Sequence, residues 1–340
     1  MLWLKADAQA NNSGTTLATD GQRVDNWKDQ TYNDLDADDS GGSGPVWVAD
    51  GINGNPVLDF TGSESGGNPL DIPLGIMQEE TKTNMYVYAV CVTDVNQTNT
   101  LFWQRLNSSN TTEIFSFIPR FSGANNTYWD NGHTSAGRLS IGSGASLEQP
   151  YLYSLKSTSG AMGIKRNNYL IATNTKTASS TANDILPFYI GYRYNNSGNY
   201  FDGKLAELII LDGVPSSAEE DQIESYLSMK YGIGLETAAD LKSSSGTEIW
   251  DKDENSSYNT GVTGIGRDDV SGLDQKSSQS ENSSDILKIS TISNAQTGAD
   301  NSFEMWGNNN GAVAVQQTEK PASFSHRLTR EWLVQETGTV

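Results

Sequence analysis

The sequence predicts an all-β protein, a sandwich or a jelly roll, and two observations support this. Hydrophobic residues make up only 35% of the chain, yet it contains 8 Trp and 14 Tyr, a mixture that indicates short strands and long polar loops rather than disorder. Short apolar runs also recur between turn-rich stretches, which is typical of such folds. The runs are Pro56–Phe60, Met85–Val92, Glu113–Ile118, Tyr151–Leu155, Tyr169–Ala172, Phe188–Tyr194 and Leu205–Leu211.

One helix is expected after the last of these runs. Ser216 and Glu219 have the spacing of a capping box, and Gly232 provides a stop signal. The apolar positions between them follow helical spacing and are Ile223, Tyr226, Leu227 and Tyr231. We expect this helix to lie across one end or face of the sandwich and to carry no chemistry.

The single cysteine, Cys91, lies inside the alternating apolar run that begins at Met85. It has no partner for a disulfide within the chain, so we interpret it as a small core residue rather than a nucleophile. The cysteine count therefore says nothing about the compartment.

Length and charge limit the organisation and the partners. A chain of 340 residues is long enough for one large domain and a second, smaller one. With 42 acidic and 22 basic residues, the net charge is -20, a field that repels nucleic acid and anionic membranes. No apolar run approaches the length that spans a membrane. Neither nucleic-acid binding nor membrane insertion is therefore expected.

The composition and the ends of the sequence suggest a location. A strongly acidic β protein rich in Asn and Thr fits the outside of a bacterium, so we expect a secreted protein of the cell surface. No signal peptide precedes the first apolar residues, and the last residues read as a strand. We therefore expect a monomeric module cut from a much longer chain.

Four landmarks in the first 235 residues carry a resemblance to a family. They are Leu2–Asp7, Val24–Asp29, Gly51–Phe60 and Phe201–Leu211 followed by the capped helix. In this order they resemble the bacterial LamG-like, concanavalin A-like family. The resemblance implies a jelly-roll sandwich of two curved antiparallel sheets over residues 1–235, with one C-terminal helix that closes the domain. The sequence departs from the family pattern after Asp29, where residues 30–42 replace a short turn.

Residues 236–340 are similar to a second, smaller β module that often follows LamG-like domains in giant Gram-negative surface adhesins and gliding-associated proteins. The stretches that carry the resemblance are Gly246–Trp250, Thr263–Asp269, Gly272–Lys276, Ile286–Ile289, Phe303–Gly307 and His326–Trp332. Gly264–Arg267 has some likeness to a phosphate-binding loop. It lacks a third glycine, a Lys-Ser/Thr pair and a following helix, so we interpret it as a turn.

Catalysis is not expected. Hydrolases with this sandwich place carboxylates two strand positions apart on one face, and no such run occurs here. Glu207 has Leu205 and Ile209 as its neighbours on the same face, which favours a metal ligand or a satisfied core acid. The two histidines, His133 and His326, lie near no Ser or Cys motif.

Calcium is the ion that the sequence favours. The run that begins at Asp34 places carboxylates at alternating positions before glycines, and hard cations prefer several oxygens on a flexible loop. A solvated acidic loop is the alternative. In LamG-like modules a structural calcium commonly lies near the first loop and the acid of the last strand. The resemblance therefore implies Asp29 and Glu207 as ligands, with Asp34 as a third.

Two segments combine aromatic rings with polar neighbours, as carbohydrate sites do. The first, Asn125–His133, is expected to be a loop, and so is the second, Tyr192–Asn196. The alternative is that these rings only brace their loops. The candidate ligand-binding residues are Tyr128, Trp129, Asp130 and Asn131 in the first segment and Tyr192, Arg193, Tyr194 and Asn195 in the second.

Three functions remain after this reasoning. The favoured one is a carbohydrate-binding module of a large bacterial surface adhesin, whose partner is a glycan on a cell or matrix surface. A structural or protein-binding module explains the same acidity and second domain without any glycan. A polysaccharide-active enzyme is the least favoured, because the sequence has no carboxylate dyad.

Overall fold

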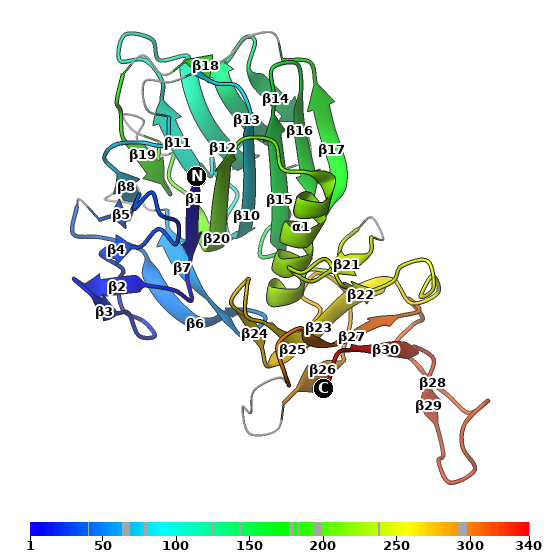
Figure 1. The fold of residues 1–340 in the computed structure, drawn as a ribbon. Coiled ribbons are helices and arrows are strands. Elements are labelled where there is room, and N and C mark those ends of the chain that lie inside the picture. The colour runs from blue at the N-terminus through cyan, green and yellow to red at the C-terminus, as the bar shows by residue number, and fades with distance from the viewer. Residues whose placement is uncertain are drawn as a thin grey trace. The chain divides into compact units, whose positions relative to one another are not determined.

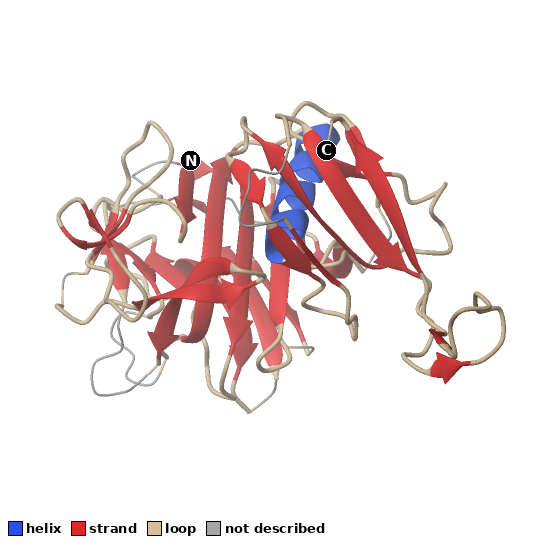
Figure 2. Cartoon of the chain, turned by 90° about the horizontal axis from the view of Figure 1, so that it is seen from below, coloured by secondary structure: helices blue, strands red, loops and turns tan. Residues whose placement is uncertain are grey.

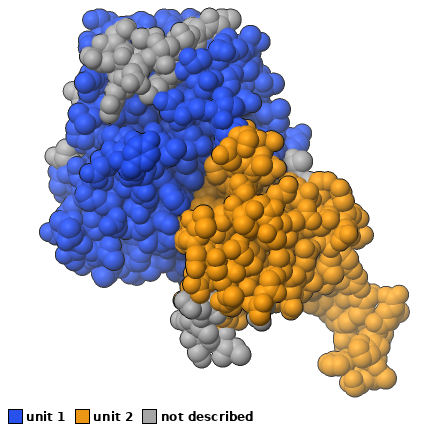
Figure 3. All heavy atoms as spheres, viewed as in Figure 1, with its two compact units in different colours: residues 1–215 blue, residues 216–340 orange. Residues whose placement is uncertain are grey.

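The chain forms two compact units, Met1–Pro215 and Ser216–Val340 (Figure 3). The computed structural model describes residues 1–39, 41–62, 69–77, 81–123, 125–142, 144–176, 180–181, 184–193, 199–236, 239–291 and 298–339. The division between the units lies earlier than the predicted boundary after residue 235. The reason is the helix, whose buried residue Met229 belongs to the core of unit 2.

Unit 1 contains two large antiparallel sheets and a small two-stranded one (Figure 1). The eight-stranded sheet, in spatial order, consists of β17 (Tyr169–Asn174), β16 (Met162–Arg166), β15 (Pro150–Ser157), β10 (Met85–Thr93), β20 (Asp202–Asp212), β7 (Asn55–Thr61) and β6 (Val46–Ile52), with β1 (Leu2–Lys5) also paired to β20. The small sheet pairs β18 (Ser180–Thr181) with β9 (Thr81–Lys82).

The second large sheet of unit 1 has ten strands and carries the site described below. In spatial order these are β14 (Arg138–Ile141), β13 (Asn126–His133), β12 (Glu113–Phe121), β11 (Phe102–Arg105), β19 (Phe188–Ile190), β8 (Leu70–Ile72), β5 (Ala37–Asp38), β4 (Asn26–Trp27), β2 (Ala10–Ser13) and β3 (Thr16–Leu17). The strand predicted from Phe188 to Tyr194 therefore ends earlier, at Ile190.

The core of unit 1 contains side chains from both large sheets, which confirms the predicted all-β sandwich. Phe117 of β12 contacts Tyr153 of β15, with ring centroids 4.9 Å apart. Strand β20 pairs with β10, β7 and β1, so it lies in the middle of its sheet. Cys91 is a buried core residue, and burial raises the pKa of its thiol to about 12.

Unit 2 is built on a four-stranded antiparallel sheet. Its order is β24 (Leu273–Gln275), β23 (Thr260–Asp268), β27 (Ser302–Asn308) and β30 (Trp332–Thr337). Three two-stranded pairs accompany it, namely β21 (Leu241–Lys242) with β22 (Glu248–Trp250), β25 (Ser277–Gln279) with β26 (Lys288–Ser290), and β28 (Val315–Gln316) with β29 (Arg327–Leu328). The β28–β29 hairpin projects from the body of unit 2 as an arm (Figure 1).

The helix predicted from the capping signals is α1 (Ser217–Tyr231), which Figure 2 shows in blue. The Ser216 and Glu219 side chains form the predicted capping box, and Gly232 ends the helix in the left-handed conformation. In unit 2, Met229 of α1 packs in one cluster with Trp250 and Phe303. No helix in the described part of the chain is long and apolar enough to cross a membrane.

The interpretation of Gly264–Arg267 as a turn is wrong, because these residues lie within strand β23. A Cβ atom on Gly264 would lie 2.2 Å from the sulfur of Met305, and one on Gly266 would lie 2.5 Å from Phe303. Both contacts are far closer than atoms approach, so glycine lets β23 pack directly against side chains of β27. These glycines therefore serve packing.

Candidate functional site

The outer face of the ten-stranded sheet carries a line of polar and aromatic side chains. Successive residues of a strand point to opposite faces of the sheet. Phe115, Phe117 and Trp129 lie in the core, so they and their cross-strand partners mark the inner face. The cross-strand partners on the outer face form one line, which runs through Arg138, Asp130, Ser116, Trp103, Tyr189 and Asp71. Six adjacent strands, from β14 to β8, therefore each contribute one residue to this line.

A buried ion pair lies at one end of the line. Asp130 is fully buried, and the Arg138 guanidinium donates to both of its carboxylate oxygens at 2.6 and 3.0 Å. The Ser116 hydroxyl donates to the same carboxylate at 2.9 Å. Burial raises the pKa of Asp130, and the hydrogen bonds from Arg138 and Ser116 oppose this shift. The Arg138 guanidinium also lies 4.7 Å from the ring centroid of Tyr128, so this end is rigid and cationic at its surface.

Four rings continue from the middle of the line, and we call Trp103, Tyr189, Tyr192 and Tyr200 the aromatic row. The centroids of Trp103 and Tyr189 are 6.2 Å apart, and those of Tyr189 and Tyr192 are 6.0 Å apart. Tyr192 then stacks on Tyr200 at 4.8 Å with an interplanar angle of 20°. The three tyrosines are half-buried, so their rings are partly accessible.

The row depends on how the chain leaves β19. Tyr192 and Tyr200 pair as an isolated antiparallel bridge, and the amide of Arg193 donates to the carbonyl of Asn199 at 3.2 Å. Gly191, with φ of 82°, lets the chain turn there, and its amide donates to Leu101 at 2.8 Å. The turn brings the ring of Tyr192 back to Tyr189, so residues outside the regular strands complete the row.

Two hydrogen-bond donors at this face lack protein acceptors. Trp103 is 4% exposed, and in the described part of the chain its indole Nε1 has no partner. The half-buried guanidinium of Arg193 likewise has no hydrogen bond or ion pair there. Burial lowers the pKa of Arg193, and the positive charge of Arg138 lowers it further. Both groups only donate, and the described residues supply neither with an acceptor.

The structure corrects part of the predicted ligand set. Asn125–His133 is not a loop, because Asn126–His133 forms β13. Trp129 is 0% exposed, its ring packs on Phe115, and its Nε1 donates to the carbonyl of Lys156 at 3.1 Å. Asn131 is equally buried and donates to Ser157 at 3.0 Å. Trp129 and Asn131 are therefore core residues that no ligand on the outer face reaches.

The remaining candidates fall into two groups. Tyr128 and Asp130 point to the outer face, and Tyr192 and Arg193 lie beside it, so the structure brings these four to one side of the ten-stranded sheet. Tyr194 and Asn195 lie outside the described residues. The carboxylate of Asp130, however, accepts hydrogen bonds from Arg138 and Ser116, so its role is to position these two side chains.

The residues implied as calcium ligands do not fit a metal ion. One oxygen of Asp29 accepts from the amides of Trp3 and Thr31, and the other accepts from the Thr31 hydroxyl and the Leu35 amide, at 2.8 to 3.1 Å. Glu207 accepts from the indole of Trp3 at 2.5 Å. Asp34 is exposed. No group of three or more His, Cys, Asp or Glu side chains with metal-site geometry occurs among the described residues.

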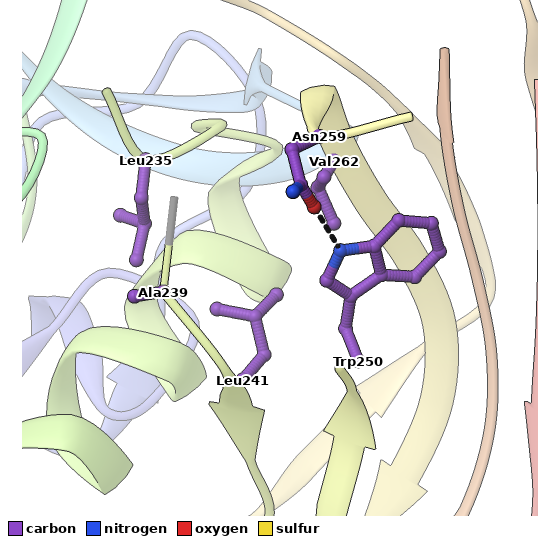
Figure 4. A pocket seen from close by; sticks show the side chains of 6 residues that line it. All are labelled: Leu235, Ala239, Leu241, Trp250, Asn259 and Val262. Carbon is purple, nitrogen blue, oxygen red and sulfur yellow. Dashed lines mark hydrogen bonds between the residues drawn. The ribbon is translucent and has the colours of Figure 1, made fainter. Parts of the chain in front are cut away.

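Unit 2 contains a small apolar hollow (Figure 4). It is lined by Leu235, Ala239, Leu241, Trp250, Asn259 and Val262. The indole of Trp250 donates to the amide oxygen of Asn259 at 2.9 Å, and the amide nitrogen of Asn259 donates to the carbonyl of Lys252 at 2.7 Å. The polar groups at the hollow are thus already paired with each other, which indicates a structural role.

Reasoning from the sequence missed Trp103, Arg138, Tyr189 and Tyr200. One signal was present, since Phe102 and Gln104 alternate with Trp103 and Arg105 as the residues of a two-faced strand do. The other three positions carry no local signal of this kind. Their proximity follows from strand register, which the sequence does not display.

Comparisons with known proteins give a family for one part of the chain. Residues 219–340 match the family described as "Domain of unknown function (DUF8202)", a stretch that begins inside α1 and runs through unit 2. No curated protein matches the chain.

Solved structures resemble the chain at low identity. Domain 4 of AbnA, a GH43 extracellular arabinanase from Geobacillus stearothermophilus in complex with arabinotriose, is 14% identical over 58% of this chain and 96% of its own, with a TM-score of 0.41. The Ruminococcus gnavus IT-sialidase CBM40 bound to α2,3-sialyllactose is 14% identical over 41% and 81%, with a TM-score of 0.34. The botulinum neurotoxin serotype G binding domain is 12% identical over 68% and 52%, with a TM-score of 0.47. The family match described above, and not these solved structures, therefore makes residues 219–340 similar to a described family.

Proposed function

We propose that unit 1 is a carbohydrate-binding module that uses the aromatic row as its binding surface. The observation that carries this proposal is the continuous series of rings on the outer face of the ten-stranded sheet, in which three half-buried tyrosines continue from the buried Trp103, next to the half-buried guanidinium of Arg193. The faces of a sugar ring are weakly polar and stack on aromatic rings, whereas its hydroxyls need hydrogen-bond partners. The row and the adjoining donors supply both kinds of group side by side.

We also propose that this surface binds without catalysis. Among the described residues, three carboxylates lie on the line that crosses the outer face, namely Asp130, Asp71 and Asp38. Four steps between neighbouring strands separate Asp130 from Asp71, which is about 19 Å at about 4.8 Å a step, whereas glycosidases place their two carboxylates within about 10 Å. Asp38 is the cross-strand partner of Asp71, but this pair lies beyond the aromatic row, and Asp38 accepts a hydrogen bond from the side-chain amide of Asn26 at 2.6 Å. The acidic composition supports a place at the bacterial cell surface as one module of a longer chain.

The test is a glycan array and affinity electrophoresis with Tyr192→Ala. We expect this variant to lose retention of the glycan that the wild type binds and to melt within a few degrees of it, because Tyr192 is half-buried and lies outside the regular strands. Tyr169→Ala is the matched control. Tyr169 is 54% exposed on the edge strand β17 of the other sheet, so this variant should bind normally.

Three results would contradict these proposals. Unchanged binding by Tyr192→Ala would place the binding surface elsewhere. Failure of the wild type to bind any glycan would leave the structural or protein-binding module as the better interpretation. Release of reducing sugar from a polysaccharide, abolished by Asp130→Asn, would overturn the proposal that the surface is not catalytic.

A further inference from the structure

We propose that the saccharide bound by the aromatic row is acidic, and that Arg193 binds its anionic group. This inference rests on the proposed carbohydrate-binding function and specifies the chemical class of the ligand. The anionic group is a carboxylate or a sulfate on the sugar, placed over the outer face between the Arg138 end of the line and the rings.

The first reason is the excess of donors at the face. The guanidinium of Arg193 is half-buried and unpaired within the described residues, and beneath the surface the buried indole N–H of Trp103 also has no acceptor among them. A half-buried donor without an acceptor costs free energy, so such groups usually meet one when a ligand binds. A neutral sugar hydroxyl can accept one hydrogen bond, but a carboxylate or sulfate offers several oxygens to a planar guanidinium.

The second reason is the local charge. Asp130 already shares its two oxygens between Arg138 and Ser116, so it neutralises one guanidinium and not two. Burial lowers the pKa of Arg193, repulsion from Arg138 lowers it further, and attraction to Asp130 opposes both. An anion at this point relieves that repulsion. This end of the face is therefore cationic although the whole chain has a net charge of -20.

The third reason is the polarity of the line. Asp71 lies beyond Tyr189, at the opposite end from Arg138. An acidic sugar is therefore favoured at the Arg193 end and disfavoured at the Asp71 end, which fixes the direction in which a chain of sugars crosses the rings. Salt screens the negative electrostatic field of the whole chain, so short-range contacts with the ligand, rather than long-range electrostatics, should determine its affinity.

The experiment compares matched pairs of polysaccharides with the full chain. Methyl esterification of polygalacturonate removes the carboxylate charge and adds one methyl group, and desulfation of a sulfated galactan removes its sulfate. We expect one charged member to bind at least about tenfold more tightly than its neutral counterpart, the gain expected for a charge-assisted hydrogen bond. The pair that shows the difference identifies the anionic group.

Variants assign the preference to a residue. In Arg193→Gln, the charged and neutral members should bind with similar affinity, and the neutral one should bind about as well as it binds the wild type. Lys320→Gln removes one positive charge from the β28–β29 arm and should keep the preference. Equal binding of charged and neutral members by the wild type, or a preference unchanged in Arg193→Gln, overturns the inference while the carbohydrate-binding function stands. Absence of binding to every saccharide overturns both.

Discussion

Tyr192 stacks on Tyr200 across an isolated antiparallel bridge, with the two ring planes within 20° of each other. Both tyrosines lie outside the regular strands, and the ring of Tyr200 supports the ring of Tyr192 through this stack. Carbohydrate binding should therefore depend on Tyr200 as a support as well as on Tyr192.

We expect Tyr200→Ala to weaken glycan binding about two- to tenfold, because an aromatic pair contributes about 0.5–1.5 kcal/mol. Tyr200→Phe keeps the ring and should bind like the wild type. Titration calorimetry with the glycan identified by array measures both. A loss of the same size in Tyr200→Phe would show that the hydroxyl, and not the stack, is what matters.

The ion pair beneath the site should dominate its stability. Asp130→Ala removes the acceptor of the hydrogen bonds from Arg138 and Ser116, and because the Arg138 side chain is 35% exposed, we expect a loss of about 2–3 kcal/mol in the free energy of unfolding, measured by urea denaturation. Asp269→Ala, which removes the exposed partner of Arg267 in unit 2, should cost no more than about 1 kcal/mol. Similar losses in both variants would contradict the importance given to the buried pair.

Asp29 separates a structural role from a metal-binding one. Asp29→Ala removes the acceptor of four hydrogen bonds, so we expect a loss of at least about 2 kcal/mol that is the same in excess calcium and in chelator. Differential scanning calorimetry of both proteins in the two buffers measures it. A wild-type melting temperature that falls on chelation would instead support the calcium site predicted from the sequence.

The pH dependence of stability should reveal Asp59. Burial raises the pKa of its carboxyl, Lys204 opposes this shift, and Asp94 adds to it. An acid whose pKa is raised by folding binds more protons in the folded state, so its charge destabilises the protein above the folded-state pKa and has no effect below the usual value of about 3.9. Asp59→Asn should therefore be more stable than the wild type at pH 7.

The difference between Asp59→Asn and the wild type should shrink as the pH falls and vanish near pH 3–4. Urea denaturation across this range follows it. A variant that is less stable at pH 7 would show that attraction to Lys204 outweighs the cost of burial.

The glycines of β23 should tolerate no side chain. Gly264→Ala places a Cβ atom 2.2 Å from the Met305 sulfur and 2.8 Å from the carbonyl of Glu304, and we expect a loss of about 1–3 kcal/mol. Gly160→Ala is the control, because nothing lies within 4 Å of its added Cβ. Thermal unfolding of the full chain, which reports on both units, distinguishes them, and an unperturbed Gly264→Ala would mean that β23 and β27 separate easily.

Much of the fold could be predicted because a buried strand appears in the sequence as a short apolar run between turn signals. Met85–Val92 and Leu205–Leu211 are such runs, and the structure buries almost all of their residues in β10 and β20. The capping box of α1 is equally local. These features need no knowledge of distant residues.

The errors occurred where a residue's partner is distant in sequence. Trp129–Asn131 has the polarity of a loop, yet Asp130 and Asn131 are buried because Ser116 and Ser157 pair with them from other strands. The aromatic row is assembled in the same way, by register among strands and by the turn after β19. The hydrophobic pattern of one strand does not specify which residues of a distant strand lie beside it, so the sequence does not reveal the site.

The pairing of β1 with β20 joins the beginning and the end of unit 1, and the Trp3 indole and the Glu207 carboxylate meet across 204 residues. Such non-local pairings slow folding, because the chain must close a long loop before the contact stabilises it. At about 5–20 residues per second, a ribosome takes about 10–40 s to deliver β20 after β1. Neighbouring hairpins such as β12–β13 can form in this interval. The first strand, however, waits with its backbone unpaired, and this is the period when the nascent chain most needs protection from aggregation.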